Sequence, residues 1–160
     1  MTGTLAHGAI LVSLAVVAFG MCFIPFAISR DRRDWVALAY SAVYTNFLLI
    51  TIATVAMVWA LVAHDFSVSY VAQVGSKATP VFYTIISLWG ALEGSILFWA
   101  WVLAMYAAVV VWINAQRPGN LVPYAATALL GISLFFGILL VGPADPFKPV
   151  YPVPLDGPGP

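Results

Sequence analysis

Four long apolar segments, at about 5–28, 35–63, 82–113 and 121–141, constrain this chain more than any other feature of its sequence. Each is long enough for a helix to cross a hydrocarbon core about 30 Å thick, which takes roughly 20 residues. The segments are continuously apolar instead of alternating, so they predict helices and not a transmembrane β-barrel. Only 8% of the residues are charged, against about 25% in soluble domains. The sequence therefore predicts an all-α, polytopic helical membrane protein.

The chain divides into a membrane portion and a tail. Residues 1–142 are expected to form four transmembrane helices. Residues 64–83, between the second and third helices, are expected to form an outer-face loop that contains a short strand or an interfacial stretch. Residues 143–160 are rich in proline, which fixes its own φ and disfavours helix at the residue before it. This tail is therefore expected to be extended and to lead to a further, C-terminal part missing from the sequence. Nothing basic precedes the first apolar segment, so that segment is interpreted as a retained helix and not as a cleaved signal peptide.

Basic residues predict the orientation of the helices. Four arginines lie in the links after the first and third segments: Arg30, Arg32, Arg33 and Arg117. The two lysines, Lys77 and Lys148, lie in the segments that face the other side. Because basic residues collect on the cytoplasmic side of membrane proteins, both termini are expected on the outer, periplasmic side. Six basic and six acidic residues cancel, so the net charge gives no indication of a nucleic-acid partner.

Glu93 places a carboxylate inside the third apolar segment. Trp112 and the polar residues that follow it mark the inner end of this segment, and counting about 20 residues back from there reaches Glu93. We therefore expect a transmembrane helix at about 88–113 with Glu93 near the outer interface, where a charge costs less than at mid-membrane. Gly90 and Gly94 form a G-x-x-x-G pair that predicts a packing seam for another helix, with Glu93 hydrogen-bonded to it. A proton-handling or ligand-binding role for Glu93 is the alternative.

The sequence contains no set of residues typical of a self-contained active site. Its two histidines, His7 and His64, are expected near the outer face and are interpreted as interfacial residues and not as metal ligands. The single cysteine, Cys22, allows no intrachain disulfide and is interpreted as a small buried hydrophobic residue. Paired cysteines, a phosphate loop and a Ser/His/Asp set do not occur in the sequence. We therefore predict no catalytic residue, no haem ligand and no metal site in this chain.

Two motifs carry a family resemblance. The first is WGALEGSILFW (89–99), preceded by FSVSYVAQVGSKATPVFYTIISL (66–88), and the second is the tail ADPFKPVYPVPLDGPGP (144–160). In this order they resemble the amino-terminal region of the CcmF family of membrane haem lyases of cytochrome c maturation, which is related to the CcsA and NrfE proteins. The residues that match the motifs are Trp89, Gly90, Glu93, Gly94, Ser95, Trp99, Pro152, Pro154, Asp156 and Gly157. Many family members read G-G-H-E-G-S where this chain reads GALEGS, so Leu92 stands where they have a histidine, whose role cannot be carried over.

The resemblance implies a function in which haem is attached to the cysteines of the C-x-x-C-H motif of apocytochrome c. This chain would be the amino-terminal membrane portion that scaffolds the reaction in the bacterial cytoplasmic (inner) membrane, with the haem ligands in the missing C-terminal part. The implied partners are the rest of the same lyase, haem-delivery and thiol-reducing maturation proteins, apocytochrome c and membrane lipid. The alternative is a small four-helix accessory subunit of a respiratory or transport complex that is unrelated to haem.

Overall fold

The computed structural model describes residues 2–117 and 119–159, and this part of the chain is helical throughout its regular elements. The long helices are α1 (Thr2–Ser29), α2 (Arg33–Val62), α5 (Leu92–Asn114) and α6 (Leu121–Val141). The short ones are α3 (Ser69–Val74), α4 (Val81–Ile86) and the 3-10 helix η1 (Ser87–Trp89). Met1 and Pro118 of the predicted membrane portion and Pro160 of the predicted tail lie outside the described residues.

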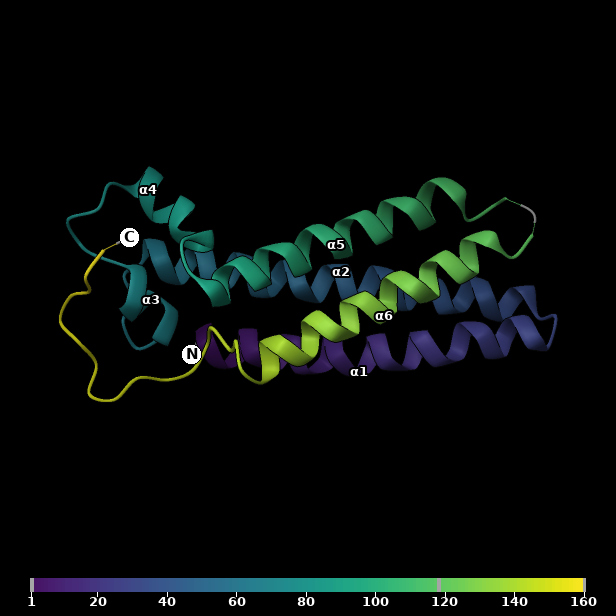
Figure 1. Cartoon of the computed structure of the whole chain (residues 1–160), viewed down its shortest axis with the longest axis horizontal. Coiled ribbons are helices and arrows are strands. Elements are labelled where there is room, and N and C mark those ends of the chain that lie inside the picture. Colours follow the sequence, from purple (N-terminus) through teal and green to yellow (C-terminus); the bar gives the residue numbers. More distant parts are fainter. Residues whose placement is uncertain (1, 118, 160) are drawn as a thin grey trace.

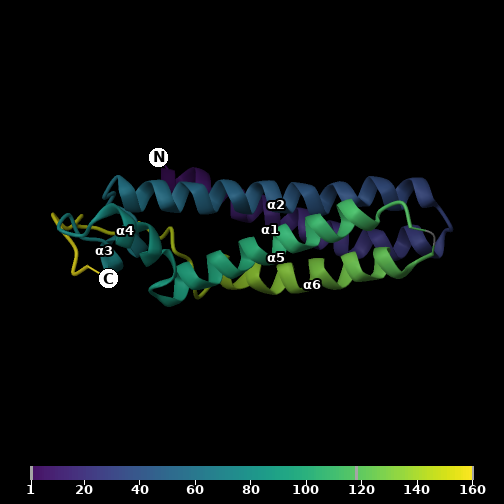
Figure 2. The same ribbon diagram turned by 90° about the horizontal axis from the view of Figure 1, so that it is seen from above.

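The four long helices form one elongated bundle (Figures 1 and 2). Each is long and apolar enough to cross a membrane, with a mean hydropathy between 2.0 and 2.5, which confirms the prediction of four helices of spanning length and composition. Helix α1 packs against α2 and α6, and α5 packs against α6 and α2, so the helices close a ring. The first residues of α1 and the tail lie at one end of the bundle, and both arginine-bearing links lie at the other (Figure 1). We call these the cap end and the arginine end; which end faces the periplasm stays a prediction.

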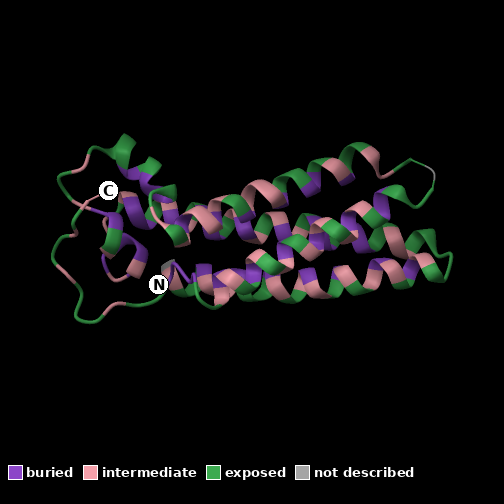
Figure 3. Ribbon diagram, viewed as in Figure 1, coloured by how far each residue is buried: buried purple, intermediate pink, exposed green. Residues whose placement is uncertain are grey.

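Buried residues occur along the whole length of the bundle and alternate with exposed ones on each long helix (Figure 3). Small residues such as Ala53, Ala100 and Ala126 line the interior, where they allow the helices to approach closely. Large apolar side chains such as Phe19 and Phe135 point outward, as expected for a surface that contacts lipid tails. The interpretation of Cys22 as a buried residue was wrong, because its position on α1 faces outward and its side chain is exposed.

The third apolar segment does not form one continuous helix. Helix α4 and η1 end before Gly90, and α5 begins at Leu92 after the extended residue Ala91. The segment 64–83 contains α3 and the start of α4 instead of a strand, and its only β-type pairing among the described residues is an isolated antiparallel bridge between Val68 and Pro149. The break before Leu92 gives the bundle a separate structure at its cap end.

Candidate functional site

The residues singled out by the sequence gather at the cap end of the bundle. We define the cap as residues 64–91 together with the described tail, residues 143–159. It contains α3, α4 and η1, and the tail runs around them without forming a helix of its own (Figure 1). The cap is therefore the part of the structure in which a functional site is to be sought.

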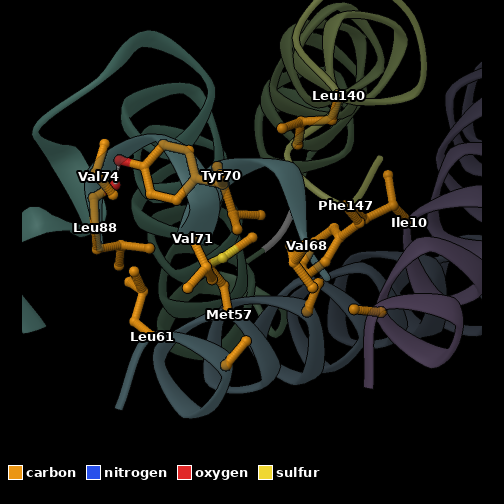
Figure 4. Close-up of a cluster of buried hydrophobic side chains, with 14 of the residues drawn as sticks. Ile10, Met57, Leu61, Val68, Tyr70, Val71, Val74, Leu88, Leu140 and Phe147 are labelled. Carbon is orange, nitrogen blue, oxygen red and sulfur yellow. Dashed lines mark hydrogen bonds between the residues drawn. The ribbon is translucent and has the colours of Figure 1, made fainter. Parts of the chain in front are cut away.

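Helix α3 anchors the cap to the bundle through one face. Tyr70, Val71 and Val74 are spaced i, i+1 and i+4 and are all buried, so they form a single apolar face on this short helix. They belong to the same hydrophobic core as Met57 and Leu61 of α2, as Figure 4 shows. Because six helical residues are too few to be stable alone, this shared core is what holds α3 in place.

Tyr70 connects α3 to the junction between η1 and α5. Its hydroxyl group donates toward the carbonyl oxygens of Ser87, at 2.7 Å, and Leu88, at 2.8 Å. The same oxygen accepts a hydrogen bond from the backbone N–H of Ala91 at 3.3 Å. The phenol oxygen thus binds backbone groups on both sides of the break, adding to the hydrogen bond that the Gly90 N–H donates to the Ser87 carbonyl oxygen at 2.9 Å. Burial raises the pKa of the Tyr70 phenol to about 12.

The two glycines of the G-x-x-x-G pair do different things. A side chain at Gly94, in the first turns of α5, would overlap the phenol ring of Tyr70 and the carbonyl oxygen of Leu88. Gly90 lies outside α5 and is exposed, and a Cβ there would meet only backbone atoms of Ser87, the nearest at 3.3 Å. The spacing predicted that both glycines form a packing seam on one helical face, and this prediction was wrong. Gly94 alone provides a close approach, and the group that it approaches is the ring of Tyr70 in α3.

The other predicted residues of the first motif surround this junction. Glu93 lies in the first turn of α5, where a carboxylate is favoured by the helix dipole. The Ser95 hydroxyl donates to the carbonyl oxygen of Trp89 at 2.9 Å and so ties α5 back to η1. Trp89 and Trp99 are 55% and 58% exposed, and with Ser95 and Phe98 they line a shallow apolar groove. We call Trp89, Phe98 and Trp99 the aromatic ledge.

The first part of the tail pairs with the start of α3. The Ser69 N–H donates to the Lys148 carbonyl oxygen at 2.8 Å, and the Val150 N–H donates to the Ser67 carbonyl oxygen at 3.0 Å. Phe147 inserts its ring into the core below this pairing, beside Val68 and Ile10 (Figure 4). The tail is therefore part of the cap's packing and not a detached linker.

The second motif, which lies in the tail, fixes the end of the tail to the loop after α3. The carboxylate of Asp156 accepts hydrogen bonds from the backbone N–H groups of Lys77, at 3.0 Å, and Gly157, at 2.9 Å. These bonds hold the pKa of Asp156 below its usual range. A Cβ at Gly157 would overlap the carbonyl oxygen of Gly75, so this glycine is needed for close approach. The two motif prolines play a lesser part here, since Pro152 is exposed and Pro154 half-buried.

The two histidines lie at the cap end of the bundle and engage different partners. The Nδ1 atom of His7, in α1, lies 3.3 Å from a carboxylate oxygen of the buried Asp145. The Nε2–H group of His64 donates to the carbonyl oxygen of Ser76 at 3.2 Å. No group of three or more His, Cys, Asp and Glu side chains that could hold a metal ion occurs within the described residues.

Sequence reasoning missed three residues on which the cap depends. Tyr70 and Asp145 both fall inside the quoted motif segments, as YVA and ADPF, but nothing in their local spacing indicated their partners. Phe147, in the same ADPF segment, packs into the bundle core. One sequence signal could have identified these three residues. Each is an aromatic or acidic residue in a segment made mostly of small residues and proline.

Comparison with known proteins matches nearly the whole chain. No family model matches the sequence. The cytochrome c-type biogenesis protein CcmF of Pseudomonas aeruginosa is 30% identical over 158 residues, which cover 98% of this chain and 24% of that protein. The biogenesis protein ccl1 of Rhodobacter capsulatus is 29% identical over 94% of this chain, and NrfE of Haemophilus influenzae is 26% identical over 94%. The chain spans about a quarter of the length of these relatives.

A solved structure shows the same fold. The structure described as cytochrome c haem lyase CcmF superposes with a TM-score of 0.81 at 30% sequence identity, covering 92% of this chain and 25% of that one. The sequence match covers 98% of this chain and the structural match 92%. This chain is therefore related, over nearly its whole length, to the amino-terminal part of the CcmF-type cytochrome c biogenesis proteins.

Proposed function

We propose that this chain is the amino-terminal membrane portion of a CcmF-type haem lyase, and that its cap scaffolds the attachment of haem to the C-x-x-C-H cysteines of apocytochrome c. The observation that carries the proposal is the match to CcmF-type proteins in both sequence, at 30% identity, and fold, with a TM-score of 0.81. The comparison proteins are named for cytochrome c biogenesis and as a haem lyase.

A scaffolding role fits the way in which the cap is built. Tyr70 fixes the junction before α5, and Asp156 and Gly157 fix the end of the tail to the loop after α3. These contacts connect segments that are far apart in the sequence, so they hold the cap in one arrangement on top of the bundle. Two side chains of the aromatic ledge, Trp89 and Trp99, are exposed beside it. We propose that the cap and the ledge form the surface against which the remaining three quarters of such a protein packs.

Haem is the substrate of this proposed reaction, and the described residues do not offer a paired axial ligand set for it. His7 and His64 each direct one ring nitrogen to a partner within the chain, and they belong to different parts of the structure. We propose that the haem ligands are supplied by another part of the protein and that this chain contributes position only. Haem-delivery proteins, thiol-reducing maturation proteins and apocytochrome c are the proposed partners, and the cytoplasmic (inner) membrane, with the cap on its outer face, is the proposed location.

Depletion of the chain in its own cells tests this proposal. We expect c-type cytochromes to lose covalently bound haem, measured by haem staining of denaturing gels, while non-covalent b-type haem in the same membranes is unchanged. Expression of the wild-type chain should restore the stain. Unchanged c-type cytochromes in depleted cells would show that the chain has another role.

A further inference from the structure

The arginine end of the bundle has a groove that the proposed function does not use. It lies between the start of α2 and the link that joins α5 to α6, at the opposite end from the cap (Figure 1). Its polar lining comes from both elements and includes Arg33, Asp34, Tyr40, Arg117 and Asn120. The groove therefore brings together side chains from two segments, 33–40 and 115–123, that are far apart in the sequence.

The two arginines of this groove differ from the other two at the same end. The guanidinium of Arg30 lies over the ring of Phe26, at 5.2 Å, and that of Arg32 over the ring of Trp35, at 4.8 Å. Arg33 and Arg117 make no such contact and form no salt bridge within the described residues. The groove thus holds two guanidinium groups, each with several N–H donors, that no carboxylate of the described chain neutralises.

Other donors face the same groove. Tyr40 lines it, is only 7% exposed, and its hydroxyl makes no hydrogen bond to any described residue. Helix α2 begins at Arg33 and α6 at Leu121, and neither helix has a side-chain cap. The Trp35 N–H already donates to the Arg32 carbonyl oxygen, and Pro123 has no N–H. The first two N–H groups of each helix are left to bind an anion, which the helix dipole also favours. Asp34 is the only carboxylate in the lining and opposes an anion there.

We propose that this groove binds the phosphate group of an anionic phospholipid. Arginine binds phosphate through two parallel N–H···O bonds, and here two arginines from different segments face one groove. The groove lies at the end of four membrane-spanning helices, where lipid head groups lie, and basic pockets between such helices on one face of a membrane are suited to these head groups. The lipid acyl chains would lie along the apolar outer surface of α2.

The test uses the full chain in nanodiscs of phosphatidylcholine with a small fraction of phosphatidylglycerol. Native mass spectrometry measures how much phosphatidylglycerol each variant retains after release from the disc. We expect the double variant Arg33→Gln/Arg117→Gln to weaken retention at least about tenfold, whereas Arg30→Gln/Arg32→Gln, with the same loss of charge at the same end, changes it less than about threefold. Asp34→Asn should strengthen retention, because it removes the opposing carboxylate.

Three results would overturn the proposal. Equal loss in both double variants, with melting temperatures in zwitterionic detergent unchanged, would mean that general surface charge and not the groove attracts the lipid. No preference of the wild-type chain for phosphatidylglycerol would exclude the site. Binding of inorganic phosphate that displaces the lipid at comparable concentration would assign the groove to a free anion instead.

Discussion

The phenol ring of Tyr70 fills the space in which a side chain at position 94 would lie, so Gly94 is what allows α3 to meet the start of α5. The hydroxyl of the same tyrosine binds the carbonyl oxygens of Ser87 and Leu88 on the other side of the junction. One aromatic side chain therefore sets both the packing and the backbone hydrogen bonds at the point where the third apolar segment breaks.

Replacing Gly94 by alanine should destabilise the cap. The added methyl group would overlap a tyrosine ring and a backbone carbonyl that cannot both move away, and overpacking of this kind costs about 1–3 kcal/mol or more. Gly90→Ala is the matched control, because its φ of −69° suits alanine and its added methyl group would meet only backbone atoms of Ser87, the nearest at 3.3 Å. Unfolding in detergent micelles, followed by circular dichroism, measures both variants. Equal stability of the two would contradict the packing described for Tyr70.

Titration of Tyr70 should weaken the cap at high pH. Burial raises the pKa of this phenol from 10.0 to about 12, and the neighbouring Glu93 carboxylate adds to the increase. Because the folded state holds the proton more tightly, the stability it contributes is complete below pH 10 and is lost as the pH rises toward 12. The loss amounts to roughly 2–3 kcal/mol.

Comparing the tyrosine titration of the wild-type chain with that of Tyr70→Phe isolates the ionisation of Tyr70. In a spectroscopic titration of tyrosine ionisation, the wild-type chain should show one late-titrating phenol that the variant lacks. Glu93→Gln should shift this phenol to lower pH by removing the nearby negative charge. If the difference spectrum shows a phenol that titrates near pH 10, Tyr70 is not in the buried environment described here.

The sequence predicted the four spanning helices because hydrophobicity over about 20 residues is a signal that tertiary packing seldom overrides. It placed Glu93 near an end of the bundle by the same length argument, and Glu93 lies in the first turn of α5. It could not predict that Gly90 and Gly94 separate, since the break before Leu92 depends on hydrogen bonds from Tyr70, which lies about 20 positions earlier. Spacing along a chain assigns two glycines to one face only if the helix is continuous through both.

Loss of the Asp156 carboxylate should release the end of the tail. Asp156→Ala removes the acceptor for the Lys77 and Gly157 N–H groups, so their amides should exchange with solvent faster. Leu155→Ala is the control, because this neighbouring side chain is 89% exposed. Hydrogen exchange followed by mass spectrometry of peptides around Lys77 makes the measurement.

The same contact should depend on pH. Hydrogen bonds from Lys77 and then Gly157 hold the pKa of Asp156 below its ordinary 3.8. A depressed pKa stabilises the folded contact above the ordinary value, and this contribution is lost as the pH falls below about 3.8. The protection of amides near Lys77, measured relative to an unstructured peptide at the same pH, should therefore fall below that pH in the wild-type chain and stay low at every pH in Asp156→Ala. Protection that is independent of pH in the wild-type chain would contradict the ionised contact.

The chain purified on its own from haem-replete membranes should contain no stoichiometric haem. The reason is that His7 and His64 each already direct a ring nitrogen to a partner of this chain, Asp145 and the Ser76 carbonyl oxygen. Absorbance in the haem region, compared with the protein concentration, is the measurement, and His7→Ala and His64→Ala are the comparison variants. A stoichiometric haem spectrum that either variant abolishes would place a ligand here after all.

The cap was only partly accessible to sequence reasoning. The motif residues Asp156 and Gly157 could be named from a resemblance, but their partners, the Lys77 N–H group and the Gly75 carbonyl oxygen, are backbone atoms that no residue pattern displays. His7 and Asp145 are separated by almost the whole chain, and their contact exists only because α1 and α6 pack side by side. The His7–Asp145 contact therefore depends on the closure of the four-helix ring, which no local sequence pattern shows.

The most direct test of the scaffolding role compares covalent haem on a C-x-x-C-H cytochrome reporter in cells that carry cap variants of this chain at equal membrane levels. Gly94→Ala and Asp156→Ala open two different parts of the cap, and Gly90→Ala and Leu155→Ala leave it intact. The account predicts that haem attachment falls at least about tenfold in the first pair and stays near wild type in the second. Normal attachment in cells whose cap variants are shown by hydrogen exchange to be open would contradict it.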